Sequence, residues 1–200
     1  RDLRMSRGLG DVYKRQNLFY GGIVMGITCL LLFIFFMLDQ ITKYMAQIWQ
    51  PNNVTAIPHI LTLDLNYNRG MAWGMLDNNT WLLVIISAVA SVVLAYICFK
   101  NDWKKNKLMS FSMTMTLAGC LGNLFDRAIS IIPGLSEGRV GVVDMISFEP
   151  LNYISRLISG SNFPIFNLAD AFLVCGLLIY AVDFIFFVDK RKKKHEKTDD

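Results

Sequence analysis

Four long runs of apolar residues divide the chain, and each is long enough to cross a bilayer as a helix. A membrane-spanning helix needs roughly 20 mostly apolar residues, and the runs that meet this requirement are residues 18–38, 80–99, 108–125 and 166–188. Two carboxylates interrupt the last run, Asp170 and Asp183, and we expect Asp183 to be an interfacial charge beside the basic tail. The pattern predicts an all-α membrane protein with four transmembrane helices.

Between the first two runs, apolar and polar residues alternate with a period of two over residues 61–68. This alternation is typical of a half-buried strand. We therefore expect a small extracytoplasmic β-element within residues 50–79. The tryptophans around it suit an aromatic belt at the membrane interface, and they are Trp49, Trp73 and Trp81.

Composition supports a bilayer environment. Hydrophobic residues make up 54% of the chain and charged residues 18%, whereas soluble domains carry about 25% charged residues. Lysine and arginine cluster in residues 1–16, 100–107 and 190–197, which predicts that both termini and the 100–107 loop are cytoplasmic. The same bias explains the net charge of +4 without a nucleic-acid partner.

The two ends of the chain differ in composition from the apolar part. Residues 11–16 resemble the translation of a library adaptor, so we expect residues 1–16 to be a non-native leader. Residues 17–189 form the predicted membrane domain, and residues 190–200 form a basic cytoplasmic tail.

Four carboxylates from distant parts of the chain are expected near one membrane surface: Asp39, Asp126, Asp144 and Asp170. Asp144 and Asp170 lie within apolar sequence, where desolvation raises the pKa of a carboxyl group. Asp39 with Lys43 four residues later is more simply a helix-stabilising ion pair. Asp126 is either a structural anchor or a competing candidate for the first acid.

Two Asn-x-x-Asp segments, 123–126 and 167–170, each place an amide beside a carboxylate on one helical face. The cysteines occur singly, and the usual motifs for a metal site or a serine nucleophile are absent from the sequence. Paired carboxylates that act as acid and base on a water molecule are the chemistry that remains.

Five segments resemble, in order, the motifs of the lipoprotein signal peptidase (signal peptidase II) family of aspartyl membrane proteases. They are residues 39–43, 68–74, 122–127, 142–145 and 163–170. The resemblance implies that Asp144 and Asp170 are the catalytic pair. It also implies supporting or substrate-binding roles for Asp39, Lys43, Asn68, Gly70, Asn123, Asp126, Arg127, Asn167 and Ala169.

The same resemblance implies cleavage of prolipoproteins on the amino side of a diacylglyceryl-modified cysteine, near the outer face of the bacterial cytoplasmic (inner) membrane. It implies a β-cradle, a short amphipathic helix, no cofactor and inhibition by globomycin. Membrane lipid and the prolipoprotein are the expected partners of a monomer. This chain departs from the family pattern at Ala118, where glycine is usual, and has longer connections at 128–141 and 147–162, which affect the substrate entrance.

Two other classes of function remain open at this stage. A small proton-coupled transporter or channel subunit also uses membrane carboxylates, but such proteins usually place them at the bilayer midplane within inverted repeats. A structural membrane subunit explains the apolar runs and leaves the five ordered motifs unexplained. Cleavage of a lipidated peptide by the purified chain distinguishes a protease from both.

Overall fold

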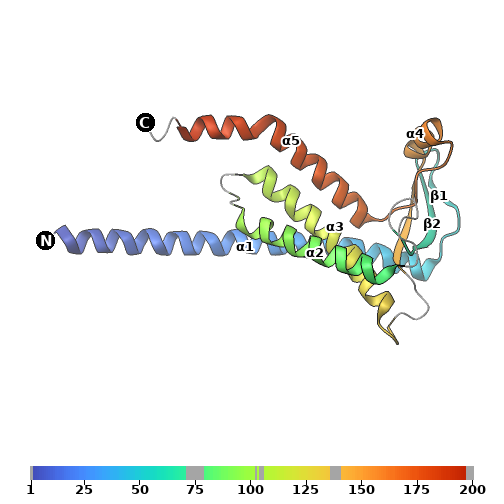
Figure 1. Ribbon diagram of the computed structural model, residues 1–200, viewed down its shortest axis with the longest axis horizontal. Coiled ribbons are helices and arrows are strands. Elements are labelled where there is room, and N and C mark those ends of the chain that lie inside the picture. Colours follow the sequence, from blue (N-terminus) through green and yellow to red (C-terminus); the bar gives the residue numbers. More distant parts are fainter. Residues whose placement is uncertain (1, 71–78, 102, 104–105, 136–140, 197–200) are drawn as a thin grey trace.

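The structure is a computed structural model that describes residues 2–70, 79–101, 103, 106–135 and 141–196. Within them the elements follow in the order α1 (Asp2–Trp49), β1 (Val54–Ile57), β2 (Leu61–Asn68), α2 (Thr80–Lys100), α3 (Lys107–Ile131), β3 (Val142–Phe148), α4 (Glu149–Ser159) and α5 (Leu168–Glu196). The sheet and α4 gather at one end of the long helices, as Figure 1 shows.

Among the described residues, four helices are long and apolar enough to cross a membrane, which agrees with the predicted count. Their spanning parts are Met25–Trp49, Thr80–Lys100, Lys107–Ile131 and Leu168–Phe187. The first differs from the prediction that a span ends before Asp39, because α1 continues through Asp39 and Lys43 to Trp49. Both charges are buried and paired with each other, so the helix does not have to end there.

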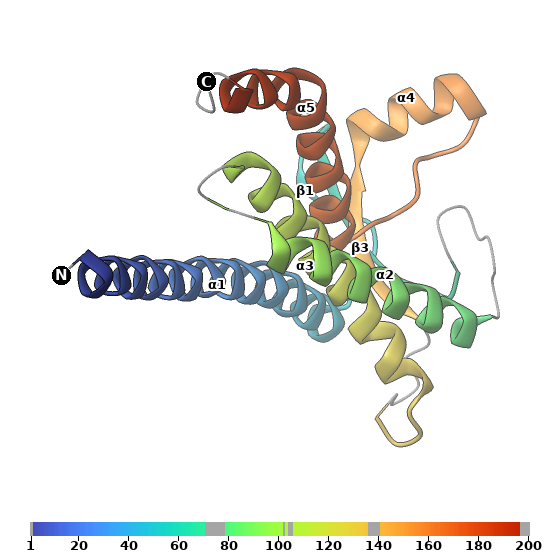
Figure 2. The same cartoon turned by 60° about the vertical axis from the view of Figure 1, so that its left-hand side comes forward.

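Helix α3 is the centre of the membrane part. Of its most apolar stretch 61% is buried, against 11–17% for the other three spans, and it packs against α1, α2 and α5 (Figures 1 and 2). Small residues allow this close approach. A Cβ on Gly119 would clash with the backbone carbonyl oxygen of Ala169 in α5, so only glycine fits there.

Asp183 contradicts the expectation of an interfacial charge. Its exposed fraction is 1%, and it interacts with other parts of the protein. It lies on the part of α5 that is turned inward, so a position near the end of the apolar run did not predict exposure. The predicted aromatic belt is consistent with Trp49 and Trp81, which are 58% and 67% exposed; Trp73 lies outside the described residues.

The three strands form one antiparallel sheet in the order β1-β2-β3. Strand β2 coincides with the predicted alternation, and β1 also falls within the expected 50–79 region. Strand β3 comes from the second long connection and was not predicted, because Val142–Phe148 shows no alternation and its first four residues are all buried. Pairing of β2 with β3 places Asn66 opposite Asp144.

Helix α4 lies within the 147–162 connection and follows β3 directly. It begins with a proline in its first turn and ends at Gly160, whose φ of 74° suits glycine. Its exposed side is apolar, with Tyr153, Ile154, Leu157 and Ile158 among the exposed residues. Helix α4 is therefore short and amphipathic, and it lies in a connection that is longer than the family pattern.

Candidate active site

Asp144 and Asp170 meet where β3 passes the N-terminus of α5, and Asn167 joins them. The Asn167 Nδ2 donates a hydrogen bond to Asp144 Oδ1 at 2.7 Å. The Asn167 Oδ1 accepts the Asp170 backbone N–H at 2.9 Å, and Asp170 Oδ2 accepts the Asn167 backbone N–H at 3.3 Å. These two bonds are the reciprocal bonds of a capping box. The start of α5 therefore fixes the Asp170 carboxylate next to Asp144.

A second amide, Asn123 of α3, holds Asp170 from the other side. Its Nδ2 donates to Asp170 Oδ1 at 2.7 Å, and its Oδ1 accepts hydrogen bonds from Asn167 Nδ2 and Lys43 Nζ, each at 3.1 Å. The sequence pattern suggested that Asn123 orients Asp126 on its own helix. The structure instead directs this amide across to α5, because α3 and α5 pack closely at Gly119 and Gly122.

Asp144 is the more deeply buried of the two carboxyl groups, with 1% of the residue exposed. Burial, followed by the negative charge of Asp170, raises the pKa of Asp144 to about 7. Hydrogen bonds from Asn68 and Asn167 and the charge of Lys43 oppose this rise. A carboxyl group with this pKa holds a proton for part of the time at neutral pH, as an acid catalyst requires.

Behind this pair lies a buried cluster centred on Lys43. Its Nζ lies 2.8 Å from Asp39 Oδ2 and 2.8 Å from Asp126 Oδ2. The Asp39 Oδ1 also accepts the Ala169 backbone N–H at 2.8 Å, next to Asp170. Asp39 and Asp126 thus act as anchors between α1, α3 and α5, and Asp126 is already committed to an ion pair.

Gln40 is a site residue that sequence reasoning missed. Its Nε2 lies 3.0 Å from Asp39 Oδ2, and 3.4 Å from both Asp126 Oδ1 and the Gly122 carbonyl oxygen. The amide therefore donates into the same carboxylate cluster as Lys43. The available signal was its place inside the 39–43 segment, immediately after the first carboxylate.

Asn68, Gly70 and Arg127 border the pair on the sheet side. The Asn68 Oδ1 accepts the Gly70 backbone N–H at 3.0 Å, while its side chain also hydrogen bonds to Asp144. The Arg127 guanidinium donates to the Gly70 carbonyl oxygen at 3.4 Å and to Ser87 Oγ at 3.5 Å. It is close enough to interact electrostatically with both Asp170 and Asp144.

All eleven residues named from the sequence are described, and they form one connected site. The rest of the 68–74 segment, residues 71–74, lies outside the described residues. Within the described part of the chain, no group of three or more histidine, cysteine or acidic residues is placed to hold a metal ion. The arrangement can supply one carboxylate as a base toward a water molecule and one carboxyl group as an acid toward the group that the water attacks.

Comparison with known proteins assigns the family. The sequence model of signal peptidase (SPase) II matches residues 31–186. The chain belongs to the signal peptidase II family. The lipoprotein signal peptidase of Staphylococcus aureus strain bovine RF122 / ET3-1 is 29% identical over 173 residues, which are 85% of this chain and 95% of that protein. The homologue from S. aureus strain JH9 is 28% identical over the same shares.

Solved structures agree with the family assignment. A bacterial membrane enzyme determined by the in meso method at 2.3 Å resolution matches with a TM-score of 0.64 and 29% identity, over 80% of this chain and 88% of that chain. A second, at 1.9 Å, has the same TM-score and identity over 82% and 95%. The family consists of aspartic-class proteases, so the chain is a multi-pass membrane protease. The transporter or channel alternative finds no support.

Proposed function

We propose that this chain is a membrane aspartic endopeptidase that removes signal peptides from lipoproteins, with Asp144 and Asp170 as its catalytic pair. The observation that carries the assignment is the position of Asn167, whose side chain bonds to Asp144 and caps the helix turn that holds Asp170. Family membership supplies the reaction class, and the names of the S. aureus relatives supply the substrate class.

In the proposed mechanism, Asp144 holds the proton and Asp170 is the ionised base. Two adjacent carboxylates do not both ionise readily, so one proton is shared by the pair. Asp170 accepts a proton from a water molecule, and the oxygen of this water attacks the scissile carbonyl carbon. Asp144 donates its proton to the carbonyl oxygen, which gives a neutral tetrahedral intermediate. The proton on Asp170 then passes to the leaving nitrogen as the C–N bond breaks, and the gem-diol proton returns to Asp144.

Asn123 and Asn167 have an orienting role in this mechanism, because each donates a short hydrogen bond to one of the two carboxyl groups. Arg127 lies close enough to favour negative charge on the pair. Asp39, Lys43, Asp126 and Ala169 hold together the helices that carry these groups. Asn68 hydrogen bonds to Asp144 from the sheet side, and Gly70 bonds to Asn68 and Arg127.

We further propose that the substrate is a prolipoprotein with a diacylglyceryl-modified cysteine, cut on the amino side of that cysteine. The basic clusters favour cytoplasmic termini and a cytoplasmic 100–107 loop. With these inside, the sheet and the carboxylate pair face the outer side of the bacterial cytoplasmic membrane, where exported lipoproteins are processed. The proposed enzyme works as a monomer in lipid, without a cofactor or nucleic acid, and is inhibited by globomycin.

The decisive experiment replaces each proposed catalytic residue with its amide isostere. Asp144→Asn and Asp170→Asn should each lower kcat for a diacylglyceryl-Cys peptide by about 10²–10⁴-fold, the usual contribution of an acid–base group. Membrane insertion and thermal unfolding of each variant establish that it is folded. Asp126→Asn is the matched comparison, because Asp126 is a carboxylate of the same site that pairs with Lys43.

We expect Asp126→Asn to lower the thermal stability and to retain more turnover per folded molecule than either catalytic variant. Near-normal turnover by a folded Asp144→Asn protein would refute the proposed pair. So would complete loss of turnover in folded Asp126→Asn together with retained turnover in Asp144→Asn, since Asp126 would then be the first acid.

A further inference from the structure

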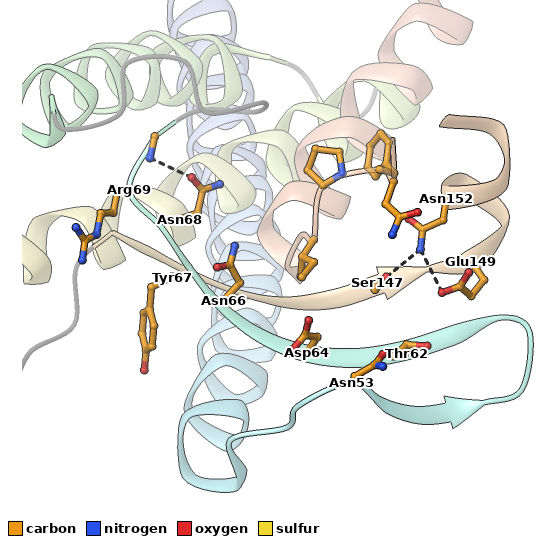
Figure 3. Close-up of a pocket in the computed structure, with 15 residues that line it drawn as sticks. Asn53, Thr62, Asp64, Asn66, Tyr67, Asn68, Arg69, Ser147, Glu149 and Asn152 are labelled. Carbon is orange, nitrogen blue, oxygen red and sulfur yellow. Dashed lines mark hydrogen bonds between the residues drawn. The ribbon is translucent and has the colours of Figure 1, made fainter. Parts of the chain in front are cut away.

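A polar cavity of about 580 Å³ opens beside the catalytic pair, between the sheet and the segment 162–165 (Figure 3). Asn68 and Gly70 line one end of it, close to Asp144. Asn152 and Glu149 of α4 line the other end. The cavity therefore lies next to the proposed catalytic site, since Asn68 lines it and also hydrogen bonds to Asp144, and it extends from there toward α4.

Strand β2 supplies a row of polar side chains along this cavity, namely Thr62, Asp64, Asn66 and Asn68. Figure 3 shows Asn66 and Asn68 on the opposite side of the strand from Tyr67. Asn68 is engaged with Asp144 and Gly70. Asp64 and Asn66 have no side-chain hydrogen bond or ion pair to the part of the chain that the structure describes, so both are available to a ligand.

The two carboxylates of the cavity differ in this respect. Glu149 already accepts a hydrogen bond from Asn152 at 3.2 Å and pairs with Arg156 at 3.5 Å. Asp64 is half-buried and has no cationic partner among the described residues. The exposed Arg69 also borders the cavity, five residues after Asp64 and just beyond the end of β2. Among the described residues, Asp64 is therefore the carboxylate of the cavity that has no ion-pair partner.

The row has roughly the spacing of an extended peptide. Side chains on one face of a regular strand repeat every two residues, about 6.6 Å, and an extended ligand has the same repeat. Asn66 pairs with Asp144, and the register with β3 shifts between Leu63 and Asn66, so the repeat is irregular at Asp64, whose side chain still lines the cavity. A peptide that leaves the catalytic pair along β2 therefore reaches Asp64 about two to four residues from the scissile bond.

The polarity of the two parts of the substrate indicates which part enters the polar cavity. The signal peptide and the acyl chains are apolar, and they match the apolar hollow formed by α1 and α3 around Phe36 and Leu124. The chain on the other side of the scissile bond is exported into water. A polar cavity with free amide and carboxylate groups suits that second part.

We propose that this cavity binds the first residues of the mature lipoprotein, in extended form along β2, and that Asp64 selects basic over acidic residues there. The inference rests on the proposed function, since it needs a peptide bond held at Asp144 and Asp170. Asp64 acts on substrate choice and takes no part in the chemical step.

The test compares lipopeptides that are identical except for one residue after the diacylglyceryl-Cys. Lysine or glutamate is placed at the second, third or fourth mature position, or about ten positions away as a control beyond the cavity. The measurement is the ratio of kcat/KM for the lysine peptide to that for the glutamate peptide, taken within each enzyme variant. The amount of folded enzyme then cancels from the ratio.

Wild-type protein should favour lysine about two- to five-fold at low salt at one or more of the near positions, as expected for a partly exposed charge pair. The preference should weaken at high salt because the ions screen it. Asp64→Asn should bring the ratio close to one, and Asp64→Lys should reverse it. Glu149→Gln should change it less, since Glu149 is already paired.

Cleavage by wild-type protein with a ratio of one at every near position overturns this inference alone. The same conclusion follows if the preference is equally strong at the distant position, survives in Asp64→Asn, or responds more to Glu149→Gln than to Asp64→Asn. Failure of the wild-type protein to cleave any lipopeptide overturns the proposed function and this inference with it.

Discussion

At the scale of single residues, Asp144 combines deep burial with a partner of the same charge. Both effects penalise its ionised form, so its pKa rises from 3.8 to about 7. A buried, ionised carboxylate costs free energy in the folded protein, whereas the same group in the unfolded chain ionises freely in water. The protonation state of Asp144 therefore affects both its proposed role as an acid and the stability of the folded protein.

This linkage predicts opposite pH trends for the wild type and Asp144→Asn. Because the folded pKa is raised, the wild type loses stability as the pH increases from about 4 to 7, and the loss is complete above 7. Asparagine resembles the protonated acid and does not titrate. At pH 8 the free energy of unfolding of Asp144→Asn should exceed that of the wild type by about 2–4 kcal/mol, with no such gain at pH 4.

Thermal unfolding in detergent at the two pH values measures this difference. The wild-type kcat/KM should fall as the pH rises through about 7, where the shared proton is lost. A stability difference that is the same at pH 4 and pH 8 would contradict the raised pKa of Asp144.

The sequence predicted the site residues better than it predicted their partners. Charged and amide residues inside apolar runs are conspicuous, so Asp144, Asp170, Asn123 and Asn167 could be named in advance. Which amide meets which carboxylate depends on the distance between two helices, and α3 and α5 approach closely through glycines that carry no chemical signal. Gln40 was missed because a glutamine at a predicted helix end looks like an ordinary polar residue.

At the scale of elements, the site depends on three helices, α1, α3 and α5, and on the strands β2 and β3. The four spans and β2 were predictable, because the signal lies within each segment. It is a long apolar run for each span and a two-residue alternation for β2. Strand β3 was not predictable, since a strand buried on both faces shows no alternation. Strand β3 forms because one of its edges pairs with β2. At its other edge, Ile146 forms an isolated antiparallel bridge with Phe166.

Lys43 is the group on which the helix packing depends most, since it joins the carboxylates of α1 and α3 while Asp39 holds the start of α5. Lys43→Met leaves two buried carboxylates without a cation, which costs about 3–5 kcal/mol. We expect a large decrease in thermal stability in detergent and loss of turnover. Lys100→Met is the control, because Lys100 is exposed and its ammonium group lies over the Tyr96 ring, and it should cost less than about 1 kcal/mol.

A triple variant separates lost charge balance from lost packing at this position. Adding Asp39→Asn and Asp126→Asn to Lys43→Met removes the unpaired charges, so part of the stability should return. If the triple variant is less stable than Lys43→Met alone, the cost of unpaired carboxylates is not the reason for the destabilisation.

At the scale of the whole molecule, the sheet and the clusters of basic residues lie at opposite ends of the spans. The sheet and α4 lie at one end of the spans, and the end of α2 and the start of α3 lie at the other, as do the start of α1 and the end of α5 (Figure 1). The basic clusters occur in the segments at this second end. If the second end is cytoplasmic, the proposed catalytic pair lies at the outer surface of the membrane, where the proposed reaction separates the apolar signal peptide from the polar mature chain.

This orientation predicts which ends react with a membrane-impermeant maleimide in intact cells. Cys29 and Cys175 are first replaced by alanine, since both are exposed on the spans. Ser159→Cys at the end of α4 should then be labelled at once, because α4 faces the outside. Lys107→Cys at the start of α3 should be labelled only after the membrane is permeabilised. The opposite order would place Asp144 and Asp170 on the cytoplasmic side, where an exported lipoprotein cannot reach them, and the proposed function would then fail on topology even if the carboxylate geometry is correct.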